Sequence, residues 1–203
     1  MLVGPKYKIC KRLGASVFEN CQTAKFQLAE ARAPRRTRPK RGGNSDFGAQ
    51  LLEKQKARFT YGLTESQFSR YVHEAMEKRG AQSTSALMAR LEARLDNVVY
   101  RAGLVKTRRA ARQLVSHGHV TVNGRRMTVP SHAVSINDVV GIRTESRTSP
   151  LFMNRAEQMA EQKTPHWMQF EEGGLSFKVV SIPALAETEV PFNAAVIIQF
   201  YSR

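Results

Sequence analysis

The sequence predicts an α+β fold, in which a mostly helical N-terminal domain holds an inserted module of two helices plus a small antiparallel sheet. A short C-terminal helix and strands follow. Apolar residues recur at helical spacing through much of residues 46–115, which predicts helices. An Asn-Gly pair at 123–124 separates two short segments of β-forming residues, which predicts a hairpin. With 203 residues, 41% of them hydrophobic, the chain can form one or two compact domains.

We expect four regions along the chain. Residues 1–45 form a basic N-terminal extension, and residues 46–85 form a helical region. Residues 86–143 form the two-helix and hairpin module. Residues 144–203 form the C-terminal helix and strands, which pack back on the helical region.

The N-terminal extension shows no sustained periodicity and ends in a basic run. Six of the ten residues from 32 to 41 are Lys or Arg, two are Pro, and none is acidic. Prolines interrupt a helix and like charges repel, so this run cannot be a stable free helix. It is either a solvated connector or a basic arm that becomes ordered on RNA, and the net charge favours the arm. Its candidate RNA-binding residues are Arg35, Arg36, Arg38, Lys40 and Arg41.

The helical region contains two helices with clear boundary signals. Ser45 or Asp46 caps the first helix, which ends near Gly62. Thr64 caps the second, with Gln67 at capping-box spacing, and Gly80 closes it. Three cations on the first helix are candidate RNA contacts: Lys54, Lys56 and Arg58.

The module begins with a third helix from Thr84 or Ser85 to Ala102. Thr107 caps a short fourth helix that Gly118 stops. The residues 119–122 and 125–129 form the hairpin strands, and 138–143 form a further strand. Downstream we expect a fifth helix at 149–163 and strands at 175–182 and 195–201.

The charge of the chain indicates a polyanionic partner. Lys and Arg number 32 against 17 Asp and Glu, so the net charge is +15. Residues 1–60 carry fourteen basic and four acidic residues, and residues 94–126 carry eight basic residues and one acidic residue. Two such concentrations suggest contact with nucleic-acid phosphates. No membrane partner is expected, because no apolar run is long enough to span a bilayer. Two cysteines and no secretory signal indicate an intracellular protein.

The fourth helix of the module is predicted to present a basic face to solvent. Its apolar positions 111, 114 and 115 lie opposite Arg108, Arg109 and Arg112, and residues 97–126 contain no carboxylate to pair with these cations. Guanidinium groups suit phosphate oxygens and stack on bases. The alternative is a soluble helical hairpin with scattered surface arginines. The full candidate set in the module is Arg94, Arg101, Lys106, Arg108, Arg109, Arg112, His117, His119, Asn123, Arg125 and Arg126.

Three sequence stretches carry a family resemblance. RLDNVVYR at 94–101, TRRAARQLVSHG at 107–118 and VTVNG at 120–124 resemble the αL-type RNA-binding module of the small-subunit ribosomal protein "four" family. SDFGAQLLEKQKAR at 45–58 and FYSR at 200–203 resemble the same family's helical region and C-terminus. The resemblance covers nearly the whole chain and its motifs are long and ordered.

The resemblance implies a structural component of the small ribosomal subunit, located in the cytoplasm on the ribosome. It implies early, primary binding to a multi-helix junction in the 5′ domain of 16S rRNA, nucleation of assembly and an influence on decoding accuracy. The implied protein partners belong to families "five" and "twelve", and messenger RNA near the entry channel is a further implied contact. Many members hold zinc with four N-terminal cysteines. This chain has only Cys10 and Cys21, so we expect no metal.

Two other function classes remain to be weighed. Arg94-Leu95-Asp96 resembles the catalytic motif of pseudouridine synthases, but only about 60 residues follow the hairpin, too few for a synthase domain. We therefore expect no enzyme and no cofactor, and expect Asp96 to form a local charge pair with Arg101 or Arg112. A free chaperone-like RNA binder would lack the helical region at 46–80.

Overall fold

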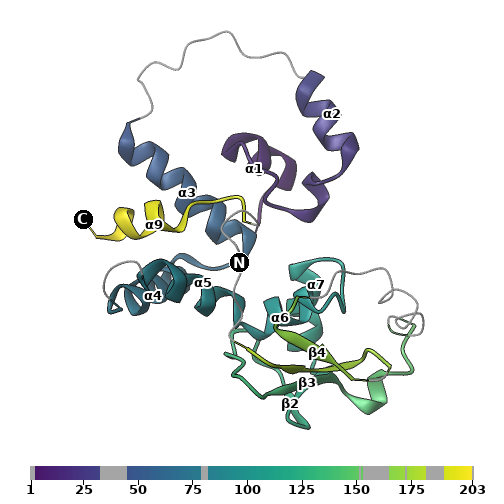
Figure 1. Cartoon of the computed structure of the whole chain (residues 1–203). Coiled ribbons are helices and arrows are strands. Elements are labelled where there is room, and N and C mark those ends of the chain that lie inside the picture. Colours follow the sequence, from purple (N-terminus) through teal and green to yellow (C-terminus); the bar gives the residue numbers. More distant parts are fainter. Residues whose placement is uncertain are drawn as a thin grey trace. The chain divides into compact units, whose positions relative to one another are not determined.

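The computed structural model describes residues 3–32, 45–78, 82–150, 152, 165–171, 173–181 and 190–202. The chain divides into two compact units, and each is considered by itself below (Figure 1). The first consists of Met1–Leu87 with Ala186–Arg203, and the second of Met88–Leu185. The predicted α+β class is confirmed, because helices and an antiparallel sheet both occur.

The first unit begins with three short helical elements. The sequence did not predict them, because residues 1–45 show no sustained periodicity. Helix α1 spans Lys6–Leu13, the 3₁₀ turn η1 spans Glu19–Cys21, and α2 spans Ala24–Arg32. Gly14 ends α1 in the left-handed conformation, at φ 63°. Elements of two turns have too few apolar positions to show a period, and their stability comes from packing. The buried cluster that they form with α3 consists of Ile9, Cys10, Leu13, Val17, Phe18, Cys21, Phe26 and Phe59.

The next two helices begin at the residues that the sequence predicted. Helix α3 spans Asp46–Thr60 and α4 spans Glu65–Met76. The side chain of Ser45 caps α3 and that of Thr64 caps α4, each accepting a hydrogen bond from the backbone N–H three residues further on. A cap satisfies one of the otherwise unpaired N–H groups of the first turn, which is why a local motif locates these starts.

The C-terminal segment is a helix, so the strand predicted at 195–201 was wrong. Helix α9 spans Ala194–Tyr201, and the Asn193 side chain caps it by accepting hydrogen bonds from two backbone amides of its first turn. Three β-branched residues at 196–198 favour a strand in isolation. Packing of α9 on α3 and α4 overrides that preference: Ile197 is fully buried.

The third predicted helix is in fact two. Helix α5 spans Gln82–Glu92 and α6 spans Leu95–Arg101, with Arg94 extended between them at φ −67°, ψ 134°. The backbone at this break bonds to a distant segment, since the Leu95 amide donates to the His132 carbonyl at 2.8 Å. Apolar spacing continues across the break, so only the long-range bond reveals it.

The second unit contains α7 and a five-stranded antiparallel sheet of order β2-β1-β3-β5-β4. The hairpin predicted around Asn123-Gly124 is confirmed, with Thr121 paired to Arg126 across it. Strand β4 was not predicted. The helix predicted at 149–163 falls largely outside the described residues. The bounds are α7 Arg108–Ser116, β1 Val120–Val122, β2 Arg125–Met127, β3 Val139–Ile142, η2 Thr144–Ser146, β4 Met168–Phe170 and β5 Ser176–Val179.

Helices α6 and α7 cover one face of this sheet (Figure 1). Val98 on α6 and Val115 on α7 are fully buried together with Val140 and Phe177 of the strands. Burial of one such side chain contributes about 1.5–3 kcal/mol. This core packs α7 against the sheet through Ala111, Leu114 and Val115. The opposite face of the helix is left exposed or half-buried. Among the described helices, none is both long and apolar enough to cross a membrane.

Candidate nucleic-acid interface

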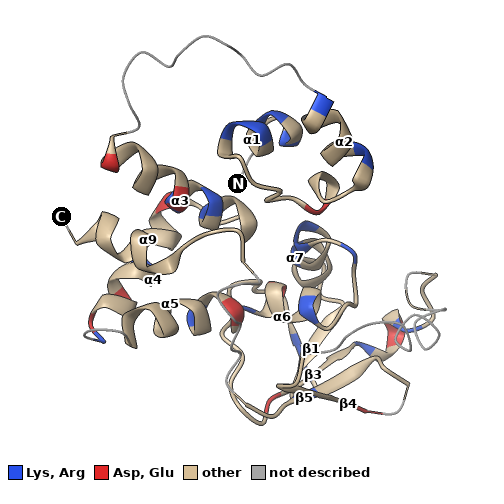
Figure 2. Ribbon diagram, turned by 45° about the horizontal axis from the view of Figure 1, so that its top comes forward, with Lys and Arg blue, Asp and Glu red and all other residues tan. Residues whose placement is uncertain are grey.

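Helix α7 carries three arginines, Arg108, Arg109 and Arg112. The Thr107 side chain caps it by accepting from the Ala110 amide at 3.1 Å. Ala111, Leu114 and Val115 face the core. Figure 2 shows basic residues on the outer side of this helix. Arg109 is exposed there and forms no hydrogen bond or ion pair with a described residue.

Arg112 and Arg94 are held by a single buried carboxylate. Asp96 Oδ2 accepts from Arg112 Nη2 at 2.7 Å and from Arg94 Nη2 at 2.9 Å. Asp96 is 3% exposed and so is Arg94. The expected charge pair between Asp96 and Arg112 is confirmed. Arg94 is a buried structural residue in this fold, and Arg112 is half-buried.

Arg101 and Arg108 join a second network around Glu92. Glu92 is fully buried and accepts hydrogen bonds from Arg101 at 3.0 Å and from the Asn97 amide at 2.8 Å. The Asn97 carbonyl oxygen in turn accepts from Arg108 Nε at 2.9 Å. The Arg108 guanidinium also lies over the Tyr100 ring, 4.3 Å from its centroid. These contacts fix the orientation of Arg108 before any ligand arrives.

Arg108 and Arg112 are half-buried and bonded to α6, so of the three arginines predicted to face solvent together only Arg109 is fully exposed. Residues 97–126 indeed contain no carboxylate, but Arg101 and Arg112 pair with carboxylates that lie before this stretch, at Glu92 and Asp96. Of these two carboxylates, Asp96 bonds to α7 and Glu92 bonds to residues of α6. The sequence drew attention to the arginines and missed Glu92, Asn97 and Tyr100, although the last two lie within the RLDNVVYR motif.

The hairpin tip is built by two residues with positive φ. Asn123 lies at φ 51° and Gly124 at φ 77°, as a tight turn of this kind requires. Asn123 also bonds Asp138 at 2.8 Å through its side-chain nitrogen, which ties the tip to the start of β3. Asn123, predicted only as an RNA contact, therefore also stabilises the hairpin.

The side chain of Arg126 lies against the backbone of Gly118. A methyl group placed on Gly118 would come within 2.1 Å of Arg126 Nε. Arg126 Nη2 donates to the His117 carbonyl at 3.2 Å. Gly118 itself adopts φ 77°. The sequence identifies Gly118 only as the residue that stops the helix. In the structure, its lack of a side chain also lets Arg126 of the hairpin contact the end of α7.

The two candidate histidines, His117 and His119, lie at the same end of α7. The rings of His117 and His119 are 6.1 Å apart between centroids. His119 Nδ1 lies 2.9 Å from Ser146 Oγ, so one of its ring nitrogens is occupied by a hydrogen bond. His117 is exposed. Only His117 thus presents its ring openly.

Four of the candidate cations in the module are exposed. Lys106 precedes α7, Arg109 lies on its first turn, and Arg125 and Arg126 lie on the hairpin. Lys106 and Arg125 form no hydrogen bond or ion pair with the part of the chain that the structure describes. Unpaired guanidinium and ammonium groups on a rigid surface suit phosphate oxygens.

The three cations predicted on α3 are all engaged within the first unit. Glu65 accepts from Lys54 at 2.8 Å and from Arg58 at 2.9 Å, while Lys56 pairs with Glu53 at 2.6 Å. Lys54 is 8% exposed. Its role is consequently to hold α3 against α4, and the arm residues Arg35, Arg36, Arg38, Lys40 and Arg41 lie outside the described residues.

Among the described residues, no group of three or more His, Cys, Asp or Glu side chains could hold a metal ion. Cys10 and Cys21 are both buried in the cluster below α1. Burial, followed by the hydrogen bond with Cys10, raises the pKa of the Cys21 thiol to about 12. Tyr7 stacks on Phe26 beside this cluster, at 5.3 Å between ring centroids. The segment is thus packed by apolar contacts.

Comparison with known proteins gives a consistent result over the whole chain. A family model described as "Ribosomal protein S4/S9 N-terminal domain" matches residues 1–92, and one described as "S4 domain" matches residues 93–140. A "Small ribosomal subunit protein uS4" of Acetivibrio thermocellus is 40% identical over 204 residues, 98% of each chain. Its counterpart in Roseiflexus castenholzii is 41% identical over 203 residues, 99% of this chain and 98% of the relative. That of Corynebacterium kroppenstedtii is 49% identical over 159 residues, 78% and 79% of the two chains.

Proposed function

The chain belongs to the uS4 family of small ribosomal subunit proteins, and from this membership we propose that it is a primary binder of 16S rRNA that nucleates assembly of the subunit body. The observation that carries the proposal is the end-to-end match, 98% of each chain, with the S4 domain placed on the module of α6, α7 and the hairpin. The family is non-enzymatic, as the sequence predicted, and membership implies rRNA and ribosomal protein partners.

The proposed RNA contacts fall into two groups. Lys106, Arg109, Arg125 and Arg126 are exposed and contact phosphates directly. Arg108, whose guanidinium Tyr100 and Asn97 hold in place, stacks on or bonds to the RNA with little loss of side-chain entropy. A rigid, shape-fitted cationic surface suits folded RNA, which proteins recognise by its backbone and 2′-hydroxyls.

The proposed RNA target is the multi-helix junction in the 5′ domain of 16S rRNA. The proposed protein neighbours are families "five" and "twelve", with messenger RNA near the entry channel as a further contact. Through these contacts the protein contributes to translational accuracy. This part of the proposal rests on the family resemblance alone.

Chemical footprinting of small-subunit rRNA with and without the protein tests the proposal. We expect protection concentrated in the 5′ domain at a multi-helix junction, in the absence of every other ribosomal protein. Protection spread evenly over the RNA, or protection that needs a second protein, would contradict primary binding.

Sedimentation separates a ribosomal component from a free RNA binder with the same module. A subunit component remains with the small subunit on a sucrose gradient in high salt, because its contacts are many and partly non-electrostatic. A free binder held mainly by phosphate contacts dissociates as salt rises. Recovery of the protein only at the top of the gradient would overturn the proposal.

A further inference from the structure

The hairpin tip contains a chemically reactive pair of residues. Asn123-Gly124 is the single Asn-Gly pair in the sequence, and both residues are exposed. In such a pair the backbone nitrogen of glycine can attack the side-chain amide carbon of asparagine, because glycine has no side chain to obstruct the approach. The reaction is spontaneous and converts asparagine into aspartate or isoaspartate. Asn123 is therefore the asparagine of this chain whose local sequence most favours deamidation.

The reaction consumes only water. The Gly124 nitrogen gives up its proton and forms a bond to Asn123 Cγ, while the Asn123 side-chain nitrogen takes up a proton and leaves as ammonia. Water then opens the resulting cyclic imide at one of its two carbonyl groups. One opening yields aspartate, and the other yields isoaspartate, in which the backbone runs through the side chain. Either product carries a carboxylate in place of the amide.

In the folded hairpin the Asn123 side chain is bonded at both of its polar atoms. Its Nδ2 donates to Asp138 Oδ1 at 2.8 Å, and its Oδ1 accepts from the Val139 amide at 2.8 Å. The Asn123 backbone N–H also donates to the Val139 carbonyl at 2.8 Å. Ring closure makes the amide carbon tetrahedral and moves it towards the Gly124 nitrogen, and this movement costs the side chain its bonds at the start of β3.

The turn itself restricts the movement that ring closure needs. Asn123 and Gly124 both have positive φ, 51° and 77°, in a two-residue turn. Val122 and Arg125 are paired directly across it. Attack by the Gly124 nitrogen requires rotation about backbone bonds of Asn123, and paired strands on both sides of so short a turn resist that rotation. Ring closure therefore requires the tip to open.

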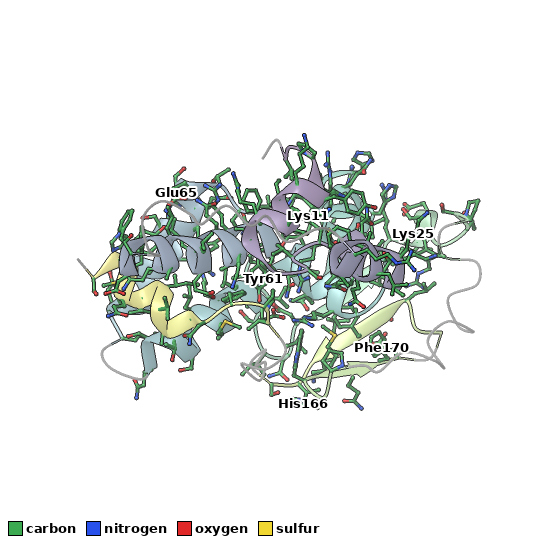
Figure 3. The ribbon with its side chains drawn as sticks, turned by 90° about the horizontal axis from the view of Figure 1, so that it is seen from above. Lys11, Lys25, Tyr61, Glu65, His166 and Phe170 are labelled. Atoms are coloured by element: carbon green, nitrogen blue, oxygen red, sulfur yellow. The ribbon has the colours of Figure 1, made fainter. Side chains whose placement is uncertain are left out.

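The acceptor Asp138 is itself held by the sheet. Its Oδ2 accepts from the Ser135 amide at 2.7 Å, and its backbone carbonyl accepts from the Val179 amide of β5 at 3.0 Å. Strand β5 pairs with β4 in turn. Phe170 of β4, labelled in Figure 3, lies against Phe177 of β5, with 5.3 Å between the ring centroids. The carboxylate that binds the hairpin amide is thus anchored in the sheet and does not follow the tip when it opens.

We propose that Asn123 is a deamidation site that its bonds to Asp138 and Val139 shield, and that its modification is a one-way change. Deamidation proceeds when the tip opens and replaces the amide donor by a carboxylate. A carboxylate cannot donate to Asp138, and two like charges at hydrogen-bond distance repel, so the modified tip loses this bond permanently. The extent of deamidation then measures the time that the hairpin has spent open. The proposal does not depend on RNA binding.

The first test compares the native chain with the unfolded chain. The full chain is incubated at mildly alkaline pH in buffer and in guanidinium chloride, and peptide mapping by mass spectrometry measures deamidation at Asn123. We expect the reaction to be at least about tenfold slower in the native chain, which corresponds to about 1.4 kcal/mol of lost hydrogen bonding on opening. Equal rates in the two conditions would overturn the proposal.

Three variants test whether the bond to Asp138 provides the shield. Asp138→Ala removes the acceptor and should speed deamidation of the native chain about tenfold. Glu145→Ala removes an exposed carboxylate elsewhere in the second unit and should keep the wild-type rate. Val115→Ala lowers the stability of the second unit by removing fully buried atoms but leaves the Asn123–Asp138 bond in place, so it should also deamidate slowly.

Two outcomes of the variant comparison contradict the proposal. If Val115→Ala accelerates the reaction as much as Asp138→Ala does, unfolding of the whole unit controls the rate and the bond does not. If Asp138→Ala slows the reaction, the carboxylate assists ring closure and is no shield.

The permanence of the change is tested with the product itself. Asn123→Asp should lower the guanidinium midpoint of unfolding, because the donor is lost and two carboxylates face each other. The double variant Asn123→Asp with Asp138→Asn exchanges donor and acceptor, and its amide at position 138 can still accept from the Ser135 amide. We expect the double variant to recover the wild-type midpoint. A wild-type midpoint for Asn123→Asp alone would show that the bond is not lost on modification.

Discussion

The guanidinium of Arg112 on α7 donates two hydrogen bonds to the same oxygen of Asp96 on α6, from Nε at 2.9 Å and from Nη2 at 2.7 Å. This pair joins the two helices of the module. Arg94 bonds both oxygens of the same carboxylate, with Nε 3.1 Å from Oδ1 and Nη2 2.9 Å from Oδ2. Asp96 therefore holds the extended break before α6 and the start of α7 in one arrangement.

Replacement of Asp96 by Ala should destabilise the protein by about 3 kcal/mol, because it leaves the buried guanidinium of Arg94 without this carboxylate. Urea unfolding followed by circular dichroism measures the change. Glu145→Ala is the matched control, since it removes a carboxylate from an exposed pair with Arg143 and should leave stability unchanged. Equal effects of the two variants would contradict the role assigned to Asp96.

Gly118→Ala and Gly124→Ala should cost similar stability but differ in RNA binding. Both glycines have φ 77°, so a side chain at either strains the backbone by about 1 kcal/mol. At Gly124 nothing lies within 4 Å of the added carbon, whereas at Gly118 the carbon would displace the Arg126 guanidinium. Filter binding to the 5′-domain RNA should therefore weaken only for Gly118→Ala. An equal loss of affinity in both variants would contradict the placement of Arg126 at the interface.

Arg109→Ala should reduce the slope of log K against log salt by about 0.9, the value for one lost phosphate contact. Arg109 suits this test better than Arg108 or Arg112, because those two arginines also hold the module together. Lys178→Ala is the matched control: Lys178 is exposed on β5, between two buried residues that face the core. An unchanged slope for Arg109→Ala in filter binding would contradict a phosphate contact at Arg109.

The stability of the protein should fall as pH rises above about 10 in a manner that depends on Tyr201. Burial, followed by the hydrogen bond to Glu65, raises the pKa of Tyr201 above its usual range. A raised pKa in the folded state favours folding below the unfolded pKa, and that contribution is lost as pH climbs beyond it. Urea midpoints of wild type and Tyr201→Phe should therefore converge with increasing pH. Parallel curves would show that the phenol ionises equally in both states.

The two thiols should resist modification in the native protein. Cys10 is 1% exposed and Cys21 is fully buried, and the pKa of Cys21 is raised to about 12 by burial and the contact with Cys10. A thiol reagent at mildly alkaline pH should react slowly before unfolding and rapidly after it. Cys21→Ser should destabilise the protein by about 1–3 kcal/mol, because it buries a hydroxyl in an apolar cluster. Fast labelling of the folded protein would contradict this burial.

The sequence by itself determined the features that depend on neighbouring residues. Ser45, Thr64 and Thr107 cap helices as predicted, because a cap needs only its own side chain and an amide three residues on. The Asn123-Gly124 turn is equally local. The family resemblance, carried by long ordered motifs, was also readable from the sequence.

Only the tertiary structure decided features that depend on distant contacts. The break at Arg94 exists because the backbone there bonds to residues 130–134, and α9 is a helix because α3 and α4 bury one side of it. In hindsight, Ala194, Ile197 and Tyr201 have the helical spacing that a short β-branched run obscured.

The division of the cations into paired and exposed was decided in the same way. The charge counts along the chain make Lys54, Arg94 and Arg109 equally good candidates for RNA contact. In the structure, Lys54 and Arg94 are buried against carboxylates, whereas Arg109 is exposed. A cation's partner is set by which carboxylate the fold brings within about 3 Å, since electrostatic and hydrogen-bond energies fall steeply with distance. Sequence separation, 11 residues for Lys54–Glu65 and 16 for Asp96–Arg112, does not encode that distance.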